Sequence, residues 1–285
     1  MANTIDSGLI AATISTKGKT VLANRLAALA LFSSDFSDQV KKPKDTIQVP
    51  LATATASTVL NPTSFSTIGG TTLTKATVVL DHVYQPFGLE YADIQNAIKL
   101  ENLVQVNMDA LADKIWALAT APITVTNFGA AVVTAADSAI TPSSGDLAKL
   151  WAGVSKSRRR GLVTNAGIYS NLIPTNALGL PLGTSGSYGF ESGVFYASSF
   201  NGVAKLAAFA CDQSAIAVAS AAPALDHVKG LMLESNSMTI DELGLTVYYN
   251  IWVDASSRNI IASFEVMFGA AKGITTGTMA LALNP

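Results

Sequence analysis

The sequence predicts an α+β protein, because helix-like and strand-like segments occur in separate blocks and do not alternate regularly. One long helical pattern covers 89–120, two strand pairs lie within 45–80 and 243–268, and residues 145–235 mix short helices with short strands.

The composition indicates a surface that is covered by partner molecules. Only 13% of the 285 residues are charged and 49% are hydrophobic, whereas an ordinary domain has about 25% charged residues. A compact 29.5 kDa monomer exposes roughly 11,500 Å². The 18 basic and 20 acidic side chains would cover such a surface thinly, so the chain either buries much surface against partners or lies in a membrane.

Segment length argues against the membrane. A spanning helix needs about 20 mostly apolar residues, and the longest uninterrupted apolar run is 26–32. Residues 1–10 contain Asp6 and no basic residue, unlike a secretory signal.

The net charge of −2 does not favour a polyanion-binding surface. The single Cys211 cannot form an intrachain disulfide, and we expect it to be buried within the apolar segment 206–211.

The first third of the chain predicts an arm followed by a projecting hairpin. Leu22, Leu26 and Leu29 have helical spacing, and a polar stretch at 33–44 follows. Strands are predicted at 46–51 and 73–80, and the residues between them, 53–72, are about half Ser and Thr. A structureless loop of this length is uncommon, so we interpret it as a flap that contacts a neighbouring subunit. The alternative is a disordered surface loop.

The strongest helical pattern lies at 89–120, and Ala121-Pro122 should end it. Such a helix would be roughly 45 Å long. Its apolar stripe consists of Ile94, Ile98, Val104, Met108, Leu111, Ile115 and Leu118.

The remaining elements are shorter. They are a helix from Ser144 or Asp146 to about Arg160 with Gly161 as its stop, a strand at 162–166, a helix at 169–173, a glycine-rich loop at 174–193, a buried sheet at 203–220, a hairpin of 243–253 with 259–268, and a final strand within 273–283.

No catalytic, cofactor or metal residue is predicted. His82 and His227 each follow an aspartate, but neither has metal-ligand spacing to a second ligand. The segment 183–187 nearly matches a nucleophile elbow but ends in serine. The only basic run is Arg158-Arg159-Arg160, which we interpret either as favourable charge at a helix C-terminus or as a contact to a subunit or to DNA.

Three segments carry a family resemblance. The phrases SDFS at 34–37 and DTIQVP at 45–50 resemble the entry to the extended loop of tailed-bacteriophage coat proteins. LAAFACDQSAIAVA at 206–219 resembles the central strand and helix of their axial domain, and 250–269 resembles their peripheral-domain hairpin. The order of elements is also similar to this coat-protein fold, which encapsulins and herpesvirus capsid floors share.

The resemblance implies four parts. These are an N-terminal arm at 1–43, an extended β-hairpin loop at 44–81, a peripheral domain with a long spine helix at 82–136 and 236–270, and an axial α/β domain at 137–235 and 271–285. Family members often carry a charged N-terminal scaffolding segment that this sequence lacks, so we expect scaffolding to come from a separate scaffolding protein or from a segment already removed.

The implied function is that of a non-enzymatic major capsid protein. It would assemble as pentamers and hexamers into an icosahedral shell around double-stranded DNA, without sequence-specific DNA binding and without a cofactor or membrane. The shell would form in the host bacterial cytoplasm, become part of the virion, and contact a portal protein. The predicted subunit contacts are Phe65, Ile68, Arg158, Arg159 and Arg160. Alternatives are an encapsulin-type compartment for protein cargo, a β-rich fibre or adhesin and, more remotely, an enzyme.

Overall fold

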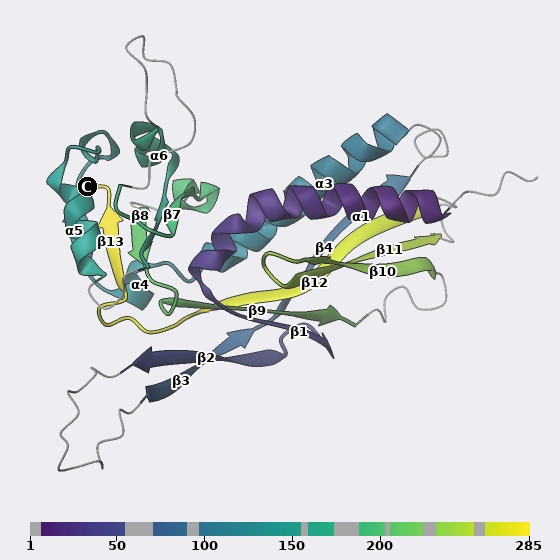
Figure 1. Ribbon diagram of the computed structural model, residues 1–285, viewed down its shortest axis with the longest axis horizontal. Coiled ribbons are helices and arrows are strands. Elements are labelled where there is room, and N and C mark those ends of the chain that lie inside the picture. The colour runs from purple at the N-terminus through teal and green to yellow at the C-terminus, as the bar shows by residue number, and fades with distance from the viewer. Residues whose placement is uncertain are drawn as a thin grey trace, which may run out of the picture.

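The computed structural model describes two sheets, a projecting hairpin and the helices that cover them (Figure 1). The described residues are 7–54, 71–89, 97–154, 159–173, 188–202, 206–224, 232–253 and 260–285.

The larger sheet is organised around one long strand. Its members are β1 (Ser33–Lys41), β4 (Asp81–Leu89), β9 (Ile216–Pro223), β10 (Met232–Ile240), β11 (Leu245–Val253) and β12 (Ile260–Lys272). The order is β1-β9-β12-β11-β10, and β4 also pairs with β12. The first part of β12 pairs antiparallel with β11 and β4, and its last part pairs antiparallel with β9. The predicted hairpin of 243–253 with 259–268 is therefore confirmed in β11 and β12.

Two helices cover one face of this sheet (Figure 1). Helix α1 (Ser7–Leu26), which continues into the 3-10 helix η1 (Ala27–Leu31), lies along α3 (Ala97–Thr120). The predicted stripe on α3 is buried from Val104 to Ile115, each side chain at most 1% exposed. A Cβ on Gly18 would lie 2.8 Å from Met108 Cε, the flexible end of a side chain on α3, so the two helices pack closely at this point. As predicted, the helix ends before Pro122.

The predicted hairpin is also confirmed. Strands β2 (Thr46–Ala54) and β3 (Thr71–Val79) pair antiparallel in an unbroken register. Strand β3 passes through Leu80 directly into β4, so residues 71–89 form a nearly continuous extended segment of roughly 60 Å. One half of this segment belongs to the hairpin and the other half belongs to the large sheet (Figure 1).

The smaller sheet has the order β5-β13-β8-β6-β7. Its strands are β5 (Val133–Thr134), β6 (Gly161–Thr164), β7 (Gly193–Tyr196), β8 (Leu206–Cys211) and β13 (Met279–Leu283). Near it lie α4 (Val125–Phe128), α5 (Gly145–Gly153), α6 (Ala166–Leu172), η2 (Asp137–Ala139) and η3 (Ser198–Gly202). The short strand and helix predicted after residue 161 and the final strand of the chain are confirmed.

Several expectations were wrong. Helix α5 stops at Gly153 and not near Arg160, and Gly161 begins a strand. Residues 206–219 form two strands in different sheets, which confirms the buried sheet expected from their apolar pattern and contradicts the strand and helix that the resemblance implied. The polar stretch at 33–41 is the edge strand β1. Strands β4 and β10 had no predicted counterpart.

Candidate functional site

The root of the β2–β3 hairpin has one buried face and one exposed face. Val49, Leu51, Ala76 and Val78 are at most 7% exposed and pack on the large sheet. The residues of the sheet in this cluster are Ala217, Ala219, Ala221 and Met267. The opposite face carries the exposed side chains of Lys75, Thr77 and Val79. The hairpin is thus anchored to its own subunit through one face and presents the other outward.

A glycine marks the point where the hairpin crosses β12. A Cβ on Gly269 would lie 2.1 Å from the carbonyl oxygen of Val79. This separation is far below van der Waals contact, and the obstructing atom belongs to the backbone and cannot rotate away. Glycine is therefore required for the two strands to cross at this distance.

The entry to the hairpin is tied to its exit. The Lys44 backbone N–H donates to the Leu80 carbonyl at 2.8 Å, and the Leu80 N–H donates to the Asp45 carbonyl at 2.9 Å. The ammonium of Lys44 also forms an ion pair with Asp81. Lys44 has a φ of 74°, which the turn into β2 requires.

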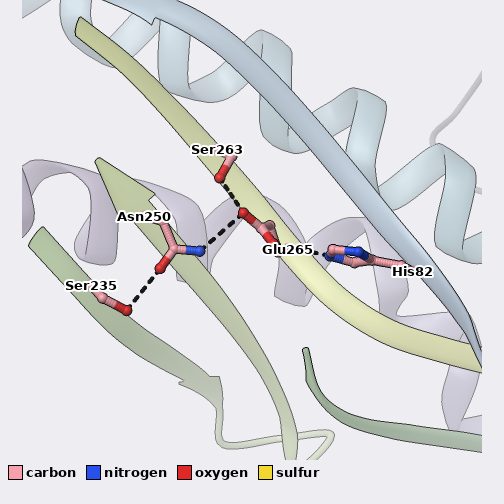
Figure 2. Close-up of polar contacts among 5 residues, drawn as sticks. All are labelled: His82, Ser235, Asn250, Ser263 and Glu265. Carbon is pink, nitrogen blue, oxygen red and sulfur yellow. Dashed lines mark hydrogen bonds and ion pairs between the residues drawn. The ribbon is translucent and has the colours of Figure 1, made fainter. Parts of the chain in front are cut away.

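A buried polar network lies next to this root, across four strands of the large sheet (Figure 2). Glu265 on β12 is fully buried. Its Oε1 accepts hydrogen bonds from Asn250 Nδ2 at 3.0 Å and from Ser263 Oγ, and its Oε2 lies 3.0 Å from His82 Nε2. Ser235 Oγ donates to Asn250 Oδ1 at 2.7 Å, which directs the amide NH₂ group toward Glu265.

These contacts compensate the cost of burying a carboxyl group. A buried charge without donors is expensive, whereas one held by several donors is tolerated. The neighbouring Tyr84 has its pKa raised, first by burial and then by the charge of Glu265. Its ring stacks on Trp252 with centroids 6.5 Å apart. The network therefore joins β10, β11, β12 and β4 through directional contacts.

A small pocket lies between β4 and α3 beside this network. Its volume is about 160 Å³, and its lining includes His82, Tyr84, Gln85 and Lys114. Gln85 Nε2 donates to Asn107 Oδ1 on α3 at 2.9 Å, so the lining is itself hydrogen-bonded. Within the described ranges, no three His, Cys, Asp or Glu side chains gather as a metal site would require.

Of the two Asp-His dipeptides of the sequence, the structure describes only Asp81-His82. Asp81 contacts Lys44 and its neighbour His82 contacts Glu265. Asp226 and His227 lie outside the described residues. Cys211 is 1% exposed, which confirms its predicted burial, and burial raises the pKa of its thiol.

The predicted contact residues are only partly described. Phe65, Ile68 and Arg158 lie outside the described residues, and Arg159 is exposed. Arg160 is 9% exposed, with its guanidinium carbon 3.8 Å from the centre of the Trp151 ring. Its Nε donates to the Val154 carbonyl at the end of α5, at 2.8 Å. An interface role for these arginines stays a prediction.

Sequence reasoning missed the network of Figure 2. Its signal was present in the sequence, because Asn250 interrupts the aromatic and β-branched strand β11 and Glu265 interrupts the apolar strand β12.

Across the described helices, none combines the length and the hydropathy that a bilayer crossing requires.

The sequence matches no protein-family model and no curated protein sequence, but the structure is similar to solved structures. A virus-like particle from Pyrococcus furiosus has a TM-score of 0.53 at 9% identity, covering 94% of this chain and 98% of that one. The capsid of a native GTA particle has a TM-score of 0.51 at 11% identity, with 91% and 90% covered. Gordonia phage Cozz has 0.50 at 13% identity, with 90% and 85% covered. These likenesses confirm the predicted fold.

Proposed function

We propose that this chain is a major capsid protein that assembles with copies of itself into a closed shell. The observation that carries the proposal is the fold, because it extends over nearly the whole chain and includes the projecting hairpin. The similar solved structures are those of a virus-like particle, a capsid and a phage.

The surface of the subunit supports self-association. The chain exposes 14,682 Å², more than the roughly 11,500 Å² of a compact monomer of this mass, and few charges are available to cover it. Apolar burial contributes about 25 cal/mol per Å². A subunit with so few charges is therefore well suited to apolar contacts with neighbours, and we assign the outward face of the hairpin root to one of these contacts.

The finer aspects of the proposal concern arrangement and contents. We place the subunits in pentamers and hexamers of an icosahedral shell in a virion, with a portal and a separate scaffolding protein as further partners. The enclosed molecule is double-stranded DNA, held without sequence readout, and assembly takes place in the host cytoplasm. The role of the chain is mechanical and requires no catalytic step.

Light scattering coupled to size-exclusion chromatography tests the proposal. The purified chain should elute as particles of megadalton mass, and a stable 29.5 kDa monomer across all salt and pH conditions would contradict it. The contents of particles produced in their natural host distinguish a genome-filled shell from a compartment that encloses one particular protein.

A further inference from the structure

The direction of the hairpin is set over a few residues at its root. Strand β3 continues through Leu80 into β4, so the first part of β4 is where the segment leaves the large sheet. His82 lies in this first part, and its ring contacts the fully buried Glu265 of β12.

The contact is diagonal across the two strands. His82 is in register with Met267, and Glu265 is in register with Tyr84, so the bond spans two positions of the ladder. Met267 belongs to the apolar cluster under the hairpin, and Glu265 lies two residues earlier on the same face of β12. The network and the hairpin root thus share one face of the sheet.

The apolar cluster by itself is a poor angular constraint. Four of its members are alanines: Ala76 of the hairpin and Ala217, Ala219 and Ala221 of the sheet. Contacts between such small side chains are non-directional, so they do not by themselves define the angle at which the hairpin leaves the sheet. A hydrogen bond to a carboxylate that Asn250 and Ser263 already hold is directional.

We propose that His82 and Glu265 form a latch that holds the β2–β3 hairpin at one angle to the large sheet. The latch is a property of the single subunit. Its consequence, a hairpin aimed in advance at the neighbouring subunit, rests on the proposed shell function.

Distances between two spin labels test the latch directly. One label is placed at Thr77→Cys on the exposed face of the hairpin, and the other at Val106→Cys on α3. The Val106 side chain is 67% exposed. Cys211 is buried and should remain unlabelled. Labelled chains are diluted with unlabelled ones, so that only distances within a subunit are measured in whatever assembly forms.

The His82→Phe variant keeps a ring but removes its nitrogens, whereas His82→Gln keeps a donor near the position of Nε2. We expect a single narrow distance distribution for the unmodified protein and for His82→Gln, and a distribution at least twice as wide for His82→Phe. The Thr239→Val control breaks a hydroxyl pair with Thr246 elsewhere in the same sheet and should leave the width unchanged.

Circular dichroism checks that each variant is folded, and His82→Leu replaces His82→Phe if the latter is not. Equal narrow distributions in all folded variants, or equal broadening in His82→Gln and His82→Phe, would overturn the latch. Electron microscopy of the unmodified protein is scored separately, because a failure to form particles would overturn the shell proposal and leave the latch intact.

Discussion

Among the glycines that the structure describes, Gly269 has the least room for a side chain. A methyl group there would meet the Val79 carbonyl oxygen at 2.1 Å, so Gly269→Ala must push the hairpin away from β12. Overpacking of this kind costs about 1–3 kcal/mol, and we expect urea denaturation to show a loss of that size in the free energy of unfolding. Gly88→Ala on β4, where a methyl group meets nothing within 4 Å, is the matched control. Equal stability of the two variants would show that the crossing is not tight.

Glu191 should make the stability of the smaller sheet dependent on acid. Its pKa is lowered from the ordinary 4.5, first by its own backbone N–H and then by that of Arg160. A lowered folded-state pKa stabilises the protein above the ordinary value, and this contribution is lost as the pH falls through the folded-state pKa. Melting temperatures of Glu191→Gln should therefore fall less than those of the unmodified protein below pH 4.5. Glu101→Gln on α3 serves as the control, and identical acid profiles for all three proteins would contradict this account.

The burial of single residues could be predicted from the sequence where one helical or strand periodicity determined which side chains face the core. The stripe from Val104 to Ile115 follows directly from helical spacing. Glu265 could not be assigned a partner, because His82 is 183 positions away in the chain and only the pairing of β4 with β12 brings them together. Arg160 was predicted at a helix end, and its side chain does reach the end of α5, but from outside the helix.

The hairpin is the element whose length can be changed with least effect on the fold. Ala52 is in register with Leu73, so an Asn-Gly turn in place of 53–72 can close a shorter hairpin. The anchoring residues Val49, Leu51, Ala76 and Val78 remain, so we expect circular dichroism and thermal melting close to those of the full chain. Stable particles should no longer form, as seen by sedimentation. Normal particles from this variant would contradict the assignment of the hairpin to a neighbouring subunit.

Helix α1 is part of the subunit core in the described structure. Leu22 and Leu26 are fully buried, and α1 packs on α3 and β10. Leu22→Ala should therefore lower the free energy of unfolding by about 2–5 kcal/mol, measured by urea denaturation. Ala27→Gly, at the exposed start of η1, is the mild control. A change below 1 kcal/mol for Leu22→Ala would indicate that α1 detaches from the sheet in solution.

Elements were predictable where local patterns and packing agreed. The β2–β3 and β11–β12 hairpins have alternating or β-branched strands, and the proline after α3 defines its end. Strands β1 and β10 were missed because edge strands have polar sequences, and β4 was missed because Asp81, His82 and Pro86 obscure its alternation. The apolar pattern of 206–219 correctly predicted buried strands, whereas the resemblance wrongly implied a helix in its second half.

At the scale of the whole molecule, the low charge and the extended hairpin both favour association between subunits. A chain with 13% charged residues and 14,682 Å² of exposed surface favours association, and a hairpin anchored through one face leaves the other available to a neighbour. The composition alone predicts that the chain has partners. The angle of the hairpin could not be predicted in this way, because it depends on contacts between residues distant in sequence.

Cryo-electron microscopy of the purified chain tests the central claim most directly. The account predicts closed shells built of rings of five and six subunits, in which residues 46–79 of one subunit lie over the next. A uniform population of single 29.5 kDa subunits, or open fibres without rings, would contradict it.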